Sequence, residues 1–164
     1  MSVFTGLTTS QIAAWTSAQL AELTAADIAD LLPSELASLT TSQITLLTTS
    51  QLAAASGEQL AGLDTADVAA LTNTQLKALA PVRFGALTTA QIVALTSSQI
   101  PNLSTAQLAA LDNTRLSAIE TADIAVMTTT QLASGIMGRL SLQQVSALGT
   151  AQIGSLSISI ISGF

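Results

Sequence analysis

The sequence is built almost entirely from one eight-residue unit, which first occurs as Leu-Thr-Thr-Ser-Gln-Ile-Ala-Ala at residues 7–14. We number the leucine of each unit position zero, and this position recurs every eight residues from Leu7 to Met127. A second aliphatic or aromatic residue follows at position five, from Ile12 to Leu132. An array of this kind predicts a solenoid, in which each repeat packs against its neighbours along the chain.

The repeat frame changes once. Five extra residues near 135–139 shift it, and position zero resumes at Leu140, Leu148, Leu156 and Phe164. We interpret the shift as a bulged connection within one array. The sequence therefore predicts a single octapeptide-repeat domain over residues 1–164.

Positions one and four carry the signal for a helix start. Position one is mostly Ser, Thr or Asp, and position four is mostly Gln, Glu or Asp. This is the spacing of a capping box, in which each of the two side chains accepts a hydrogen bond from the backbone N–H of the other residue. Pro33 and Pro81 lie at position two, the first helical residue, where proline is tolerated. Pro101 lies at position six, where it predicts a shortened turn.

Positions six and seven carry the signal for a helix end. Position seven holds Gly6, Gly62, Asn102 and Gly163, residue types that tolerate the left-handed conformation at a helix C-terminus. Small residues at position six, such as Ala13, would allow backbones to approach closely. Each octapeptide is thus predicted to form a helix of about one and a half turns.

Two other architectures fit the repeat less well. In one continuous helix, eight residues would rotate the apolar pair by about 80° per repeat, so no apolar stripe would form. In a β-solenoid, apolar spacings of five and three do not match strand alternation, and Ala and Gln are poor strand formers. We predict an all-α solenoid, whose helices are too short to be stable unless they stack.

Composition excludes several functional classes. The chain has no cysteine and no histidine, so it lacks disulfides and the commonest metal and acid–base ligands. Four basic residues and a net charge of −6 argue against nucleic-acid binding. Apolar runs are far too short for a membrane span. No signal peptide is recognisable, so export would need another route or a removed leader.

Charge is unevenly distributed along the chain. Residues 1–76 contain seven acids and no base, whereas residues 77–164 contain four bases and three acids. Opposite ends of opposite sign favour head-to-tail contact between copies.

The sequence holds few candidates for chemistry. Three carboxylate pairs have the spacing considered for calcium or glycosidase sites: Asp27/Asp30, Asp64/Asp67 and Glu120/Asp123. We interpret these residues mainly as occupants of the capping and glutamine positions. No catalytic residue, cofactor site or metal site is predicted, and the chain is expected not to be an enzyme.

Arg83, Arg115 and Arg139 lie at or near position four, where we expect them to be solvated or in contact with a neighbouring subunit. A column of threonines at position two could line one face of a solenoid and bind ice, a glycan or a protein: Thr9, Thr41, Thr49, Thr65, Thr89, Thr105, Thr121 and Thr129.

The pattern Leu-Thr-Thr-x-Gln-Ile-x-x-Leu, as in residues 87–95, resembles octapeptide arrays in large bacterial proteins described as exported, adhesin-like or surface-associated. The likeness covers nearly the whole chain. It implies an extracellular or cell-surface setting.

Apolar residues near both ends predict subunit contacts: Val3, Phe4, Ile158, Ile160, Ile161 and Phe164. A contact between unlike ends that does not close generates a filament. The sequence therefore favours a non-catalytic structural protein that self-assembles end to end into an extracellular filament or fibre, with itself as partner. The alternative is a surface binding module or adhesin that uses the threonine-lined face.

Overall fold

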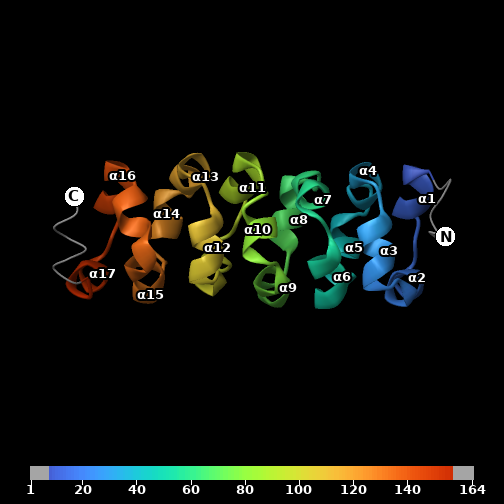
Figure 1. Cartoon of the computed structure of the whole chain (residues 1–164), viewed down its shortest axis with the longest axis horizontal. Helices are drawn as coiled ribbons and strands as arrows, with labels where there is room; N and C mark the ends of the chain where they lie inside the picture. Colours follow the sequence, from blue (N-terminus) through green and yellow to red (C-terminus); the bar gives the residue numbers. More distant parts are fainter. Residues whose placement is uncertain (1–7, 157–164) are drawn as a thin grey trace.

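The computed structural model describes residues 8–156, which form a stack of very short helices joined by extended residues, with no strand among them (Figure 1). This confirms the predicted all-α solenoid. The first and last described helices, α1 and α17, lie at opposite ends of an elongated molecule. The helices are α1 (Thr9–Ala13), α2 (Ser17–Glu22), α3 (Ala25–Asp30), α4 (Pro33–Leu36), α5 (Thr41–Leu46), α6 (Thr49–Ala54), α7 (Gly57–Ala61), α8 (Thr65–Ala70), α9 (Asn73–Ala78), α10 (Pro81–Phe84), α11 (Thr89–Val93), η1 (Ile100–Asn102), α12 (Thr105–Ala110), α13 (Asn113–Ala118), α14 (Thr121–Ile124), α15 (Thr129–Gln131), η2 (Leu132–Ile136), η3 (Met137–Arg139), α16 (Leu142–Ser146) and α17 (Thr150–Gly154).

The predicted capping box starts most of these helices. In α1, the backbone N–H of Thr8 donates to Gln11 Oε1 at 2.8 Å, and the backbone N–H of Gln11 donates to Thr8 Oγ1 at 3.3 Å. In the helix whose position one is Leu32, which has no hydroxyl, the other bond of the capping box remains, from the N-cap backbone N–H to the position-four side chain. Glu35 accepts the backbone N–H of Leu32 at 2.7 Å.

The proline predictions are also confirmed. Helices α4 and α10 begin at Pro33 and Pro81. The repeat that contains Pro101 has no α-helix and forms only the 3-10 turn η1.

The predicted left-handed helix ends are wrong. Gly62 has a φ of −79°, and Gly135 alone among the described residues has a positive φ; Gly6 and Gly163 lie outside that range. Helices instead lead into an extended position-zero residue, such as Leu23 with φ −65° and ψ 134°. Its N–H donates to the Leu20 carbonyl at 3.3 Å, so the chain can turn to the next helix without left-handed backbone.

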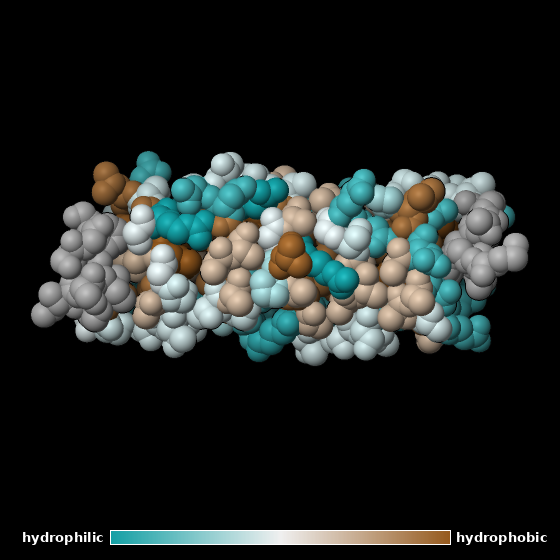
Figure 2. Space-filling model, in the orientation of Figure 1, coloured by the Kyte–Doolittle hydropathy of each residue, from teal (hydrophilic) through white to brown (hydrophobic). Residues whose placement is uncertain are grey.

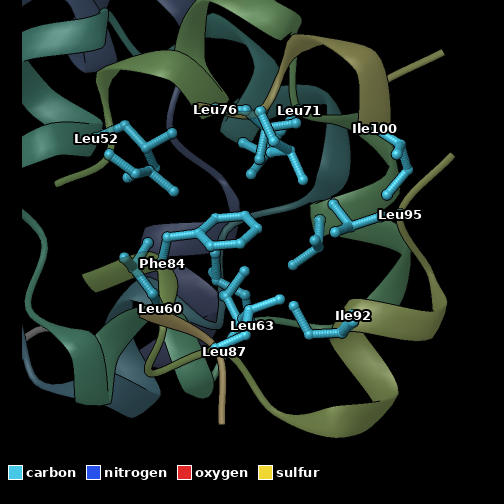
Figure 3. Packing of buried hydrophobic residues seen from close by; sticks show 14 of the residues in the cluster. Leu52, Leu60, Leu63, Leu71, Leu76, Phe84, Leu87, Ile92, Leu95 and Ile100 are labelled. Carbon is cyan, nitrogen blue, oxygen red and sulfur yellow. The ribbon is translucent and has the colours of Figure 1, made fainter. Parts of the chain in front are cut away.

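Positions zero and five form one continuous core along the stack. Position five is buried from Ile12 to Leu132, and position zero from Leu31 to Met127. Phe84 lies among leucines of neighbouring coils (Figure 3). This arrangement is the one that the two apolar positions of the octapeptide predict.

One coil of the solenoid takes between three and four octapeptides. Helices three repeats apart pack together, as in α3 with α6 and α6 with α9. Side-chain hydrogen bonds between coils join residues 25 to 31 apart, most often 28 or 31. Because this number is not whole, one edge of the molecule holds α4, α7, α11 and α13 in turn, which are three, four and three repeats apart (Figure 1).

The frame shift lies in a continuous helical segment formed by α15, η2 and η3. Gly135 kinks it with a φ of 94°, and Ile136 and Met137 are buried. Arg139 donates to the Leu111 carbonyl, 28 residues earlier, which is a separation that the regular position-four residues also show. Gln144, after the shift, donates to the Ile119 carbonyl, only 25 residues earlier. The five-residue shift therefore closes this coil with three residues fewer.

Candidate functional site

Position four, the third residue of each helix, lies between successive coils. Its side chain folds back to the N-cap and also faces the preceding coil. Glutamine at this position is nearly inaccessible in the interior, with exposed fractions of 3% for Gln75 and 1% for Gln107. A buried side-chain amide is stable only if its donors and acceptor are bonded.

Each interior glutamine meets this requirement in the same way. Gln75 Oε1 accepts the backbone N–H of Thr72 at 2.9 Å. Gln75 Nε2 donates to the carbonyls of Ile44 at 3.0 Å and Leu47 at 2.8 Å, which are positions five and zero of the preceding coil. No buried side-chain polar atom of the described residues lacks a partner. We call the following residues the glutamine ladder: Gln43, Gln51, Gln59, Gln75, Gln91, Gln99, Gln107, Gln131, Gln144 and Gln152.

Aspartate takes a different partner at position four. A carboxylate cannot donate to a carbonyl, so Asp67 accepts the hydroxyl of Thr41, 26 residues earlier, at 2.8 Å. Asp123 accepts the hydroxyl of Ser97 at 2.6 Å with the same separation. Hydroxyls at position two therefore substitute for the missing amide.

Arginine replaces the donor half of the ladder. Arg115 donates to the Leu87 carbonyl and forms an ion pair with Asp112. Arg139 donates to the Leu111 carbonyl, and its Nε donates to Asn113 Oδ1 at 2.9 Å. Arg115 and Arg139 are therefore not merely solvated, because both bond to the preceding coil of their own chain, and their contact with a neighbouring subunit stays a prediction.

Among the carboxylate pairs, Asp27 and Asp67 cap helices. Asp27 Oδ2 accepts the backbone N–H of Thr24 at 2.8 Å and its hydroxyl at 2.7 Å, and these bonds, the hydroxyl first, lower the pKa of Asp27. Asp67 accepts the backbone N–H of Asp64 at 3.1 Å. Glu120, however, makes no side-chain cap. No cluster of these residues within 8–156 is arranged to hold a metal ion.

The position-two threonines do not form one flat face. Thr41 lies partly buried between coils and bonds to Asp67. Thr105 and Thr129 line a shallow groove of about 460 Å³, together with Thr130, Ala133, Ser134 and Ser155. Because a coil takes more than three repeats, the threonine column winds around the molecule.

The ladder is incomplete in the first coil. Gln11 and Gln19 cap their helices as the interior glutamines do, with Oε1 accepting the backbone N–H of Thr8 and Thr16. Both side chains are exposed, and their Nε2 atoms donate to no group among residues 8–156. Trp15 and Leu23, at position zero, are only half-buried.

The last coil is incomplete in the complementary sense. No side-chain donor of the described residues reaches the carbonyls of Leu148 and Leu156, whereas most interior carbonyls at position zero, such as those of Leu47 and Met127, accept a glutamine. Ile153 at position five is 40% exposed, whereas its equivalent Ile124 is fully buried. The predicted contacts Val3, Phe4, Ile158, Ile160, Ile161 and Phe164 lie outside the described residues.

The fold and the ladder together define a tandem-repeat α-solenoid. Residues 84–113 and 116–158 match the family model of the ALTTAQ repeat, and these two segments cover less than half of the chain. No curated protein and no solved structure matches the chain. None of the described helices is long and apolar enough to cross a membrane.

Proposed function

We propose that the chain is a non-catalytic structural protein that assembles end to end into extracellular filaments. The observation that carries this proposal is the incomplete ladder. Exposed amide donors on Gln11 and Gln19 lie at one end of the described stack, and the carbonyls of Leu148 and Leu156, which accept no side-chain donor from the described residues, lie at the other. Donor and acceptor ends are complementary, so each copy presents both halves of one contact.

A contact between unlike ends adds copies in one direction. If successive copies continue the solenoid, the contact does not close into a ring and a filament results. The half-buried Trp15 and Leu23 and the exposed Ile153 would become buried, as their interior equivalents are. The acidic first half and the weakly basic second half of the sequence would steer unlike ends together.

The face of the stack seen in Figure 2 offers little for self-association. Exposed apolar side chains are scattered in small spots among hydrophilic residues on the face in Figure 2. This face therefore shows no continuous apolar patch of the kind that marks a contact between copies.

Electron microscopy and light scattering of the purified protein across a concentration series test the proposal. We expect filaments and a molar mass that rises with concentration. Monodisperse monomers at the highest concentration would contradict it. The extracellular setting rests on the resemblance to exported arrays, and antibody labelling of intact cells against lysed cells tests it separately.

A surface binding module is the second candidate, and the hydroxyl-lined groove around Thr105 and Thr129 favours it. Its lining contains no aromatic or charged side chain, which leaves only hydroxyls for recognition. A glycan array and a thermal-hysteresis assay test this alternative. Binding that is lost in Thr105→Val/Thr129→Val but kept in Thr65→Val/Thr89→Val would support it.

A further inference from the structure

We infer that the interior of the solenoid opens first at α10, where the hydrogen bonds that join one coil to the next are interrupted. Helix α10 lies near the middle of the stack (Figure 1). Local opening there divides the stack into two blocks, α1–α9 and α11–α17, so that α10 is a joint within one copy. The inference concerns a single chain and holds whether or not copies assemble end to end.

Arg83 occupies position four of α10 but makes none of the bonds that this position makes elsewhere. From Gln43 to Gln152, every other position-four residue is hydrogen-bonded to the preceding coil. Arg83 is half-buried and has no hydrogen bond or ion pair to any of residues 8–156. The carbonyls of Leu52 and Ala55, at the ladder's separations of 31 and 28 residues, therefore accept no side chain from α10.

The start of α10 is also less secured than the starts of similar helices. Its N-cap residue is Ala80, and no side chain caps the helix. Helix α4 likewise has an apolar N-cap residue followed by proline, but Glu35 still accepts the backbone N–H of Leu32 at 2.7 Å. In α14 the N-cap side chain is unbonded, yet Asp123 bonds to the preceding coil. Among the described α-helices from α5 to α16, only α10 lacks both kinds of bond.

Apolar packing does not offset the missing bonds. Phe84 at position five is fully buried and is larger than the usual leucine. Ala55 at position zero of the preceding coil is also fully buried, and it is smaller than the usual leucine. Together these two side chains contain as many carbon atoms as two leucines, so the hydrophobic contribution is similar to that of other junctions. Because the polar bonds are fewer, the junction at α10 is weaker than its neighbours.

Amide hydrogen exchange, measured by NMR on the native chain, tests the inference. Leu76, Phe84 and Ile92 hold position five in α9, α10 and α11, and each backbone N–H donates to its N-cap carbonyl at 3.0 Å. Because these three bonds are matched, a difference in protection reports local opening. We expect the Phe84 amide to exchange about tenfold faster than the other two, after correction for intrinsic rates. Equal protection of the three amides would overturn the inference.

The variant Arg83→Gln should close the joint, because it restores the residue type of the glutamine ladder at position four of α10. Its side-chain oxygen can accept the backbone N–H of Ala80, and its amide can donate to the two carbonyls of the preceding coil. We expect the protection of the Phe84 amide to rise about tenfold, to the level of the amides in α9 and α11.

Arg115→Gln is the matched control, because Arg115 also holds position four but already donates to the preceding coil. It should leave the exchange of the Phe84 amide unchanged. An unchanged rate for Phe84 in Arg83→Gln would overturn the inference, and so would an equal slowing in the two variants.

Discussion

At the scale of single residues, position four explains why glutamine predominates in the repeat. A capping box needs only an acceptor at this position, and glutamate or aspartate would provide one. Glutamine also has the two N–H donors that bond to the preceding coil, as in Gln75 with Ile44 and Leu47. The capping half could be predicted from local spacing. The donor half could not, because its partners are 28 and 31 residues away.

The adjacent residues Gln143 and Gln144 separate these roles. Gln144 is buried and donates to the Leu116 and Ile119 carbonyls at 2.9 Å each, whereas the Gln143 side chain is exposed. We expect Gln144→Ala to lower the free energy of unfolding by about 2 to 4 kcal/mol, since it leaves buried carbonyls and an N-cap amide without partners. Urea denaturation followed by circular dichroism measures this loss.

Gln143→Ala is the control for that variant. It deletes the same type of side chain, but from an exposed position one residue earlier. It should change the free energy of unfolding by less than about 0.5 kcal/mol. Equal effects of the two substitutions would show that helix propensity, and not the ladder, sets the stability of this coil.

Asp27 gives a pH dependence of known sign. The Thr24 hydroxyl and then the Thr24 amide lower its pKa from the ordinary value of 3.8. The unfolded chain therefore binds this proton more readily, so the contribution is present above pH 3.8 and is lost as pH falls toward the folded-state pKa. NMR titration should show a higher pKa for Asp27 in Thr24→Val than in the native chain. An unchanged pKa would contradict the assigned cause.

At the scale of the element, the extended leucine at position zero decides how each helix ends. Glycine at position seven suggested left-handed ends because that conformation is common at longer helices. The structure uses a different device. Leu23 ends its helix with an i to i−3 hydrogen bond and extended backbone, which leaves its side chain to pack against the core. The apolar spacing alone could not distinguish these two connections.

Gly135 and Gly138 test the backbone of the frame shift. A Cβ at either glycine would have nothing within 4 Å, but only Gly135 has a positive φ, at +94°. We expect Gly135→Ala to lower the free energy of unfolding by about 1 to 2 kcal/mol, the cost of a left-handed conformation for a residue with a Cβ. Gly138→Ala should not destabilise the protein by a comparable amount, and thermal unfolding of the two variants compares them directly. Equal losses would contradict the assigned strain.

At the scale of the whole molecule, the repeat predicts the class of fold but not the size of a coil. Capping, proline placement and the two apolar positions are local features, and each identifies a short helix that must stack. The number of repeats per coil depends on how helices such as α3 and α6 pack, and on bonds between coils such as Gln51 to Leu20 and Leu23. The incomplete ends likewise become visible only when Gln11 and Gln19 are compared with their buried equivalents.

The central claim is that the glutamine ladder continues from one copy to the next. The molar mass of the double variant Gln11→Ala/Gln19→Ala, measured by light scattering at a concentration where the native protein assembles, tests it most directly. We expect the variant to stay monomeric and folded by circular dichroism, while Gln143→Ala assembles like the native chain. Assembly of the double variant to the native molar mass would contradict the claim.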